Sequence, residues 1–133
     1  REIIGRLLLL HAAQVAAVPT FVQQACIEAL KTDVSYMNDA YSRRRALVCK
    51  RLQEMGMCFA KPAGAFYIFA DISRFNMDSA TFCTRLIKEG GVAAVPGSCF
   101  GAEGYVRISC CCSEEVLRTG MDRLEQYIKE RKV

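Results

Sequence analysis

The sequence predicts an α+β fold, an α/β sandwich in which helices pack on a small and largely antiparallel sheet. Residues 2–55 carry apolar side chains at helical steps of three and four. After Gly56 the period changes, and aromatic and β-branched residues recur as they do in strands. Single helices then separate short strands. The expected order is helix, helix, long helix, two strands, helix, two strands, helix.

Two helices are expected over residues 2–18 and 20–30, with Pro19 between them. The first segment resembles a secretory signal in its early cation, apolar centre and small residues. Arg6 and His11 interrupt the apolar run, however, and the segment is too short and too polar to span a membrane. We interpret it as an amphipathic helix cut out of a longer chain.

A long helix is expected over residues 34–55, with Thr32 or Asp33 as its N-cap and Gly56 as its terminator. Its length of roughly 33 Å, at 1.5 Å per residue, suits a connection between two domains. Arg43–Arg45 is interpreted as a solvated face of this helix. The apolar stripe comprises Val34, Met37, Tyr41, Val48, Leu52 and Met55.

The remaining elements are expected as strands over 58–60 and 66–71, a helix over 80–89, strands over 92–95 and 105–110, and a final helix. Asp78 or Ser79 can cap the middle helix, and Ser113 can cap the last one. The buried face of the middle helix is predicted to be Phe82, Cys83, Leu86 and Ile87, and that of the last helix Leu117, Met121, Leu124 and Ile128.

The amino-acid composition limits which classes of protein this chain can belong to. With 133 residues, 52% of them hydrophobic and 24% charged, the chain is predicted to be globular. The net charge of +4 is mild and spread out, so neither a nucleic acid nor a membrane is an expected partner. Eight cysteines form no C-x-x-C pair beside a single histidine, which argues against a metal site. We interpret the cysteines as core filler in a reduced, cytoplasmic protein.

Most searches for catalytic groups fail. His11 lies on an apolar helix, and no nucleophilic residue stands at a spacing from it that would indicate a catalytic pair. Residues 97–101, GSCFG, have cysteine where a nucleophile elbow has serine. No lysine has an apolar context that would prepare it for Schiff-base chemistry; the six are Lys31, Lys50, Lys61, Lys88, Lys129 and Lys132.

Arg107 is the exception. Alternation places Tyr105, Arg107 and Ser109 on the strand face opposite Val106, Ile108 and Cys110. Such an arginine either points to water or binds a planar anion with its fork of donors, and periodicity leaves both readings open. A glycine-rich loop before the strand, and face-mates that can hydrogen-bond, favour an anion site.

At these residues the chain resembles a known family. The runs are PAGAFYIFADIS (62–73), LIKEGGVAAVPGSCFG (86–101), YVRIS (105–109) and SEEVL…MDRL (113–124), together with the helix segment 41–56. They resemble the C-terminal part of class I/II aminotransferases, the fold type I pyridoxal-phosphate enzymes of the aspartate aminotransferase superfamily. The resemblance implies that residues 1–33 end a large domain and that residues 34–133 form the small domain with its connecting helix 34–55.

The resemblance also implies a function. Such an enzyme transfers an amino group between an amino acid and a 2-oxo acid on pyridoxal 5'-phosphate, and Arg107 would bind the substrate α-carboxylate and assist domain closure. The family's Schiff-base lysine and cofactor contacts match nothing in this sequence. The chain is therefore expected to be a truncated piece that is inactive alone, binds no cofactor, and works with its large domain, as a homodimer in the full-length protein.

Two alternative hypotheses remain, and neither involves catalysis: the chain is a standalone carboxylate-binding module, or it is a dimerisation module. Substrate specificity, and the distinction from lyase or synthase relatives, are left open by the sequence.

Overall fold

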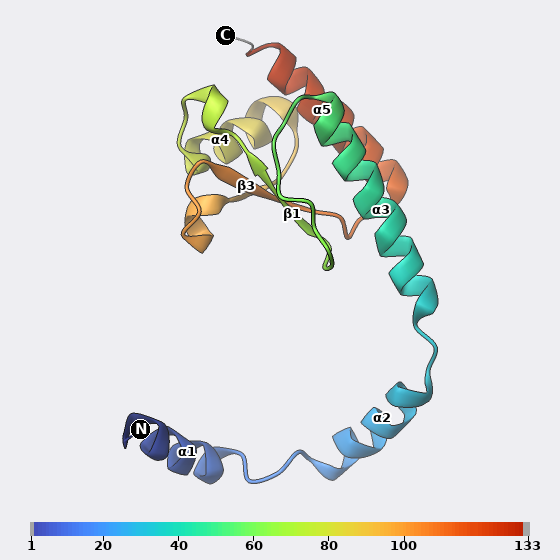
Figure 1. Ribbon diagram of the computed structural model, residues 1–133, viewed down its shortest axis with the longest axis vertical. Helices are drawn as coiled ribbons and strands as arrows, with labels where there is room; N and C mark the ends of the chain where they lie inside the picture. Colours follow the sequence, from blue (N-terminus) through green and yellow to red (C-terminus); the bar gives the residue numbers. More distant parts are fainter. Residues whose placement is uncertain (1, 132–133) are drawn as a thin grey trace. The chain divides into compact units, whose positions relative to one another are not determined.

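A computed structural model describes residues 2–131, and the chain divides between Val34 and Ser35 into two compact units (Figure 1). The N-terminal unit contains α1 (Glu2–Gln14) and α2 (Thr20–Lys31), and neither helix buries a side chain. The first helix ends before the predicted residue 18, because β-branched Val18 precedes Pro19, which disfavours helical backbone. Large apolar side chains of this unit are exposed, among them Ile3, Leu7, Leu8, Leu9, Leu10, Phe21 and Leu30.

The second unit opens with α3 (Ser35–Glu54), which agrees with the predicted 34–55 within one residue at each end. Gly56 follows with a φ of 67° and ends the helix as expected. The predicted apolar stripe holds only over the C-terminal half, where Val48 and Leu52 are buried. Met37 is 45% exposed, because the sheet and the last helix do not reach the N-terminal turns of α3.

The sheet has three antiparallel strands in the order β1-β3-β2. These are β1 (Tyr67–Asp71), β2 (Val95–Pro96) and β3 (Tyr105–Ser109), so β3 is central. The predicted α+β class with a small antiparallel sheet is confirmed.

Two predicted strands are wrong in extent. Residues 58–60 contribute only an isolated bridge between Phe59 and Ala70, because Pro62 has no N–H with which to continue the pairing. The predicted strand 92–95 is reduced to Val95–Pro96. The Val92 amide instead donates to the Leu86 carbonyl at 3.3 Å, which ties it to the end of the preceding helix.

The middle helix is α4 (Ser79–Arg85), followed by a π turn over Leu86–Gly90. Asp78 caps it, since its carboxylate accepts from the Thr81 amide at 2.8 Å. The prediction that Ile87 is buried is wrong, and its side chain is 52% exposed. Successive helical residues are about 100° apart, so with Leu86 turned into the core its neighbour points outward.

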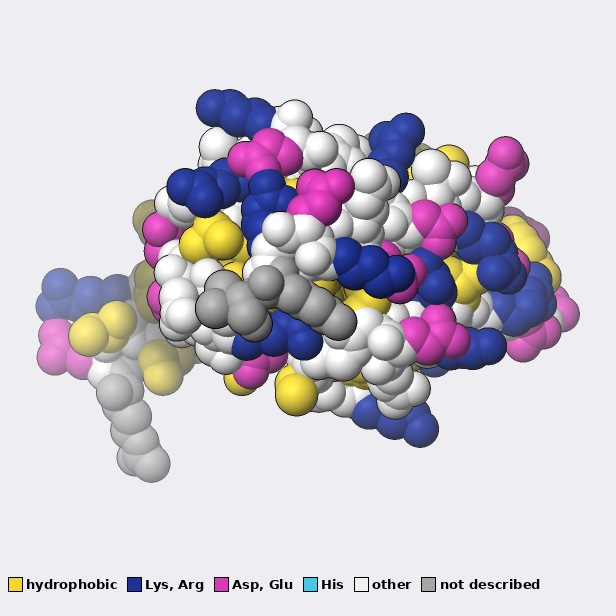
Figure 2. Space-filling model, turned by 90° about the horizontal axis from the view of Figure 1, so that it is seen from above, with side chains coloured by type: hydrophobic (Ala, Val, Ile, Leu, Met, Phe, Trp, Pro, Cys, Tyr) yellow, Lys and Arg dark blue, Asp and Glu magenta, His cyan; other side chains and the backbone are white. Residues whose placement is uncertain are grey.

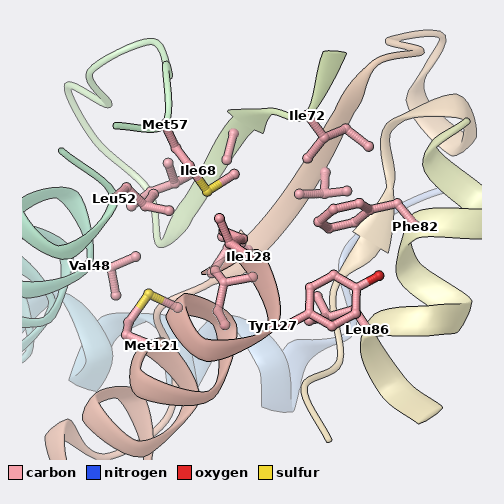
Figure 3. Packing of buried hydrophobic residues seen from close by; sticks show 14 of the residues in the cluster. Val48, Leu52, Met57, Ile68, Ile72, Phe82, Leu86, Met121, Tyr127 and Ile128 are labelled. Carbon is pink, nitrogen blue, oxygen red and sulfur yellow. The ribbon is translucent and has the colours of Figure 1, made fainter. Parts of the chain in front are cut away.

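The last helix is α5 (Glu114–Lys129), capped as predicted by Ser113, whose hydroxyl accepts from the Val116 amide at 3.3 Å. Its predicted apolar stripe is buried, and Tyr127 joins it. Helices α3, α4 and α5 together enclose one face of the sheet (Figure 3). The core residues that Figure 3 labels are Val48, Leu52, Met57, Ile68, Ile72, Phe82, Leu86, Met121, Tyr127 and Ile128.

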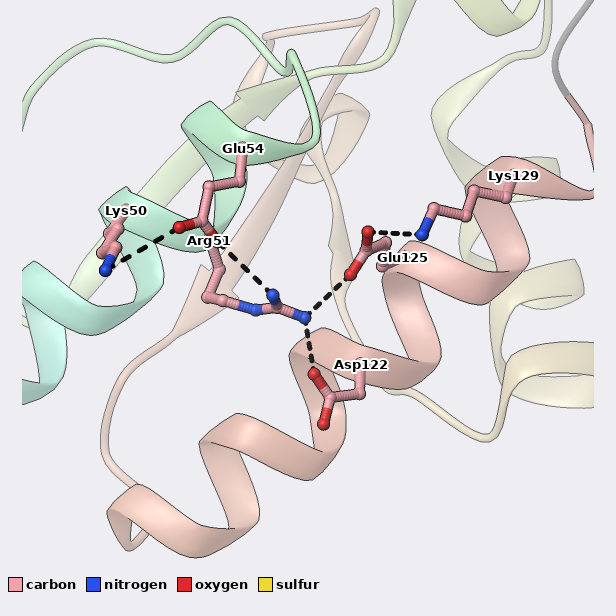
Figure 4. A network of polar contacts seen from close by, with 6 residues as sticks. All are labelled: Lys50, Arg51, Glu54, Asp122, Glu125 and Lys129. Carbon is pink, nitrogen blue, oxygen red and sulfur yellow. Dashed lines mark hydrogen bonds and ion pairs between the residues drawn. The ribbon is translucent and has the colours of Figure 1, made fainter.

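Charged side chains tie α3 to its neighbours. Arg51 pairs with Asp122 at 2.5 Å and with Glu125 at 2.9 Å, which joins α3 to α5 (Figure 4). Arg44 and Arg45 are half-buried and donate to the carbonyls of Cys111 and Ala65. The predicted solvated face is therefore wrong for these two arginines, because backbone carbonyls of the segments beside α3 accept their hydrogen bonds.

The cysteines are only partly core filler. Cys83 and Cys110 are buried and Cys49 is half-buried, but the other five are exposed. The prediction fails for those five because they lie on loops, on turns or on a helix that buries no side chain. Among the described residues no helix combines the length and apolarity needed to cross a membrane. On the face that Figure 2 shows, Lys and Arg side chains are interspersed with Asp and Glu.

Candidate functional site

Arg107 lies at the middle of the central strand, paired with Phe69 of β1 on one side and Val95 of β2 on the other. Its neighbours Val106 and Ile108 are buried on the helix-covered face, as alternation predicts. Arg107 itself is half-buried on the opposite face. A rigid strand with partners on both sides therefore fixes the backbone of this arginine.

Two aromatic rings enclose the guanidinium of Arg107. Its central carbon lies 4.2 Å from the ring centroid of Tyr67 and 4.3 Å from that of Phe100. Phe69 meets Phe100 edge-on at 5.6 Å and supports the second ring from the strand below. Two aromatic rings thus lie against the guanidinium, and these cation–π contacts order the side chain.

The in-plane edge of Arg107 is open. Within residues 2–131 no acidic side chain pairs with it and no acceptor takes a hydrogen bond from it. A guanidinium carries five N–H donors in its plane, and two of them match the two oxygens of a carboxylate. The arrangement therefore suits a planar anion that binds the N–H groups of Arg107 beside the two rings.

The second ring is carried by a tight loop over residues 97–104. Gly97 is buried, and a Cβ there would lie 2.0 Å from the Ala102 carbonyl oxygen and 2.5 Å from that of Tyr105. Only glycine therefore allows the loop to fold back on itself. The sequence suggested that loop glycine would let backbone approach a ligand; at Gly97 the close approach is to the loop's own backbone.

Glu103 fastens the same loop to α4. One carboxylate oxygen accepts from the Ser79 amide at 2.6 Å and from the Gly104 amide at 2.9 Å. The other accepts from the Ser79 hydroxyl at 3.0 Å, and the Ser98 amide donates to that hydroxyl at 3.2 Å. The backbone hydrogen bond from Gly104, followed by that from Ser79, lowers the pKa of the Glu103 carboxyl below its ordinary value.

Sequence reasoning proposed Arg107 as a site residue but did not propose its neighbours Tyr67, Phe100 and Glu103. Tyr67 was detectable in principle, because it and Phe69 share one face of a predicted strand. Phe100 and Glu103 lie in a loop, where periodicity carries no information about direction. The predicted partner Ser109 faces the same side as Arg107, yet its hydroxyl donates to the Cys111 thiol at 3.1 Å.

The other sequence candidates are exposed side chains, or they belong to the loop that carries Phe100. His11 and the lysines at positions 31, 50, 61, 88 and 129 are exposed, and Lys132 lies outside the described residues. Residues 97–100 of GSCFG form a short 3₁₀ turn. No group of three metal-ligating side chains occurs in the described part of the chain.

Comparison with known proteins gives one consistent family. The family "Aminotransferase class I and II" matches residues 3–124. The chain is 47% identical, over 86% of its length, to the aromatic-amino-acid aminotransferase 2 of Thermococcus litoralis, of which it covers 31%. It is 39% identical, over 99% of its length, to the probable N-acetyl-LL-diaminopimelate aminotransferase of Bacillus subtilis, of which it covers 35%.

A solved structure agrees with these relatives. The aromatic aminotransferase of Pyrococcus horikoshii superposes with a TM-score of 0.85 at 44% identity, over 97% of this chain and 36% of that one. The chain thus spans about a third of the length of the proteins it matches.

Proposed function

The chain belongs to the aminotransferase class I and II family, and we propose that it forms the C-terminal part of a pyridoxal-phosphate-dependent enzyme. That enzyme transfers an amino group between an amino acid and a 2-oxo acid. In it, residues 34–133 act as the small domain and residues 1–33 end the large domain. The division of the structure between Val34 and Ser35 supports this assignment.

In this proposal Arg107 binds the substrate α-carboxylate. The observation that carries it is a guanidinium that lies against the rings of Tyr67 and Phe100 while no acidic side chain among residues 2–131 pairs with it. A carboxylate that meets two of its N–H groups forms two parallel charge-assisted hydrogen bonds, which fix its plane as well as its position. Fixing the carboxylate orients the remaining bonds of Cα, and orientation is a large part of what an enzyme contributes to such a reaction.

Pyridoxal phosphate, when bound, supplies the electron sink for amino transfer. The side chains of this chain do not fit that group, since every lysine among residues 2–131 is exposed and none faces Arg107 from an apolar pocket. The isolated chain is therefore proposed to bind carboxylates weakly and to catalyse nothing. A stable Schiff base between one of its lysines and added pyridoxal phosphate, seen as a stoichiometric absorption band, would contradict this.

The large domain and a second copy of the full-length enzyme are the proposed partners. The apolar side chains exposed on α1 and α2 support this proposal, because such side chains are usually buried against another part of a protein. Movement of the small domain toward the large one would bring Arg107 and its carboxylate together away from water, as in other enzymes that close on substrate.

The test is kinetic and uses an aminotransferase that carries this chain as its C-terminal part. Arg107→Ala removes two charge-assisted hydrogen bonds, each worth about 1.5–3 kcal/mol, so the KM for the amino donor should rise by roughly 100-fold or more. Arg107→Lys keeps the charge but loses the fork, and should recover only part of the loss.

Two further variants distinguish a loss of contacts at the Arg107 site from a general effect of removing a side chain or a charge. Phe100→Leu removes one ring face and should raise the KM by only a few-fold, because one cation–π contact is worth about 0.5–1 kcal/mol at an exposed position. Arg118→Ala, at an exposed position on α5, removes the same charge elsewhere and should leave the KM unchanged. Unchanged kinetics for Arg107→Ala would make the arginine a surface residue.

A further inference from the structure

Three consecutive cysteines follow β3, and they differ in environment. Cys110 is fully buried in the core, whereas Cys111 and Cys112 are exposed in the short connection to α5. Both ends of that connection are held. The Cys110 amide donates to the Phe66 carbonyl at 2.7 Å, and Ser113 caps α5. The two exposed thiols therefore sit side by side on a fixed piece of backbone.

The sulfur of Cys111 is surrounded by groups that favour its thiolate. The Ser109 hydroxyl donates to it at 3.1 Å, and the guanidinium of Arg44 is anchored on the Cys111 carbonyl at 3.4 Å. The hydrogen bond from Ser109 lowers the pKa of the Cys111 thiol, and smaller contributions come from a hydrogen bond with the Cys112 side chain and from the charge of Arg44.

The neighbouring cysteines, Cys110 and Cys49, are less reactive toward thiol reagents than Cys111 and Cys112. Burial raises the pKa of Cys110 to about 11, and burial likewise raises the pKa of Cys49. A thiol that is both buried and protonated reacts slowly. The reactive sulfur in this region therefore belongs to Cys111 and Cys112.

Adjacency also decides how the two thiols react. Consecutive Cα atoms are about 3.8 Å apart, which is below the range of roughly 4.4–6.8 Å found across disulfides. Closing a disulfide between Cys111 and Cys112 would strain the chain, so oxidation within the pair is disfavoured. A larger bridging atom with longer bonds to sulfur spans the pair without that strain.

We propose that Cys111 and Cys112 form a chelating site for soft, thiophilic centres that take two thiolates, with trivalent arsenic as the ligand class. Soft ligands such as thiolates prefer soft centres, and two sulfurs plus one organic group satisfy trivalent arsenic. With phenylarsine oxide as probe, two As–S bonds form while the arsenic–oxygen bond breaks. The two thiol protons leave with that oxygen as water, and no atom changes oxidation state.

The test measures phenylarsine oxide binding to the full 133-residue chain by titration against a competing small dithiol, with mass spectrometry to locate the adduct. The unaltered chain should carry one bridged phenylarsenic group on the peptide containing Cys111 and Cys112, stable to excess glutathione. Cys111→Ser and Cys112→Ser should each weaken binding about 100-fold or more, because the second bond of a chelate is intramolecular.

Cys58→Ser is the matched control, since Cys58 is also exposed and lies outside the pair; it should bind like the unaltered chain. All three positions are on the surface, so near-identical thermal unfolding of the variants will show that folding is intact. An adduct that maps to other cysteines, or one that both single variants of the pair retain undiminished, would overturn the proposal.

Discussion

The guanidinium of Arg107 is ordered before any ligand arrives. Fixing a free arginine side chain costs about 2 kcal/mol of rotamer entropy. Each ring beside Arg107 contributes about 0.5–1 kcal/mol, so Tyr67 and Phe100 together offset most of that cost. A carboxylate that binds the open edge then has little side-chain entropy left to overcome, and more of its hydrogen-bond energy becomes affinity.

Glu103 gives a prediction with a pH dependence. Its pKa is lowered in the folded chain by hydrogen bonds from the Gly104 and Ser79 amides, relative to an ordinary value of 4.5. The stabilisation is therefore complete above about pH 4.5, where an unfolded glutamate is also ionised, and is lost as the pH falls through the folded pKa. Glu103→Gln should lower the Tm at neutral pH, and the difference from the unaltered chain should shrink below about pH 4.5.

Calorimetry or circular dichroism across that range measures the difference. Glu130→Gln, at an exposed position after the end of α5, serves as the control and should show no comparable change. A Tm difference for Glu103→Gln that stayed constant down to the lowest pH would show that the carboxylate charge is not what holds the loop.

At the scale of elements, two glycines are predicted to respond in opposite ways to the same substitution. Gly97→Ala places a Cβ 2.0 Å from the Ala102 carbonyl oxygen, so the loop must shift, at a cost of about 1–3 kcal/mol. Gly120→Ala lies within α5, where a Cβ meets nothing within 4 Å, and should stabilise by about 0.5–1 kcal/mol because alanine loses less backbone entropy. Urea unfolding of both variants measures the pair.

The Gly97 variant should also disturb Phe100, which the same loop carries, and so weaken the Arg107 site. If Gly97→Ala were as stable as the unaltered chain, the close backbone approach in this loop would not be what excludes a side chain.

Helix lengths and strand faces were predictable where local pattern decides them. Val48 and Leu52, or Val106 and Ile108, are buried because a period of 3.6 or 2 fixes which way each side chain points. The prediction failed where a distant partner decides. The Val92 amide donates to the Leu86 carbonyl, in the turn after α4, and is therefore not available to the sheet. Met37 is exposed because the buried core does not extend to its part of α3.

In the candidate site, too, some residues could be predicted from local sequence and others could not. Arg107 could be found because an arginine in an apolar strand is conspicuous, and the family resemblance suggested its role. The second aromatic contact of Arg107 depends on Phe100 and on the Glu103 hydrogen bonds, which join residues far apart in sequence through an irregular loop. No local rule specifies the direction of side chains on such a loop.

For the whole molecule, the two units should be separable. Because α1 and α2 bury no side chain, a chain beginning at Ser35 should unfold cooperatively with a Tm close to that of the full chain. Removing the exposed apolar residues of the first unit should also reduce self-association, which sedimentation velocity measures. A markedly lower Tm for residues 35–133 would mean that the helices of the first unit support the second.

The central place of β3 has a consequence for motion. Arg107 faces a partner residue on both sides, Phe69 and Val95, so its strand cannot swing locally without breaking two ladders at once. Its backbone amide should therefore exchange with deuterium only when the unit as a whole opens. Any travel of the Arg107 backbone toward a bound acid would then be rigid-body travel of the unit that begins at Ser35, with the pivot lying outside the sheet.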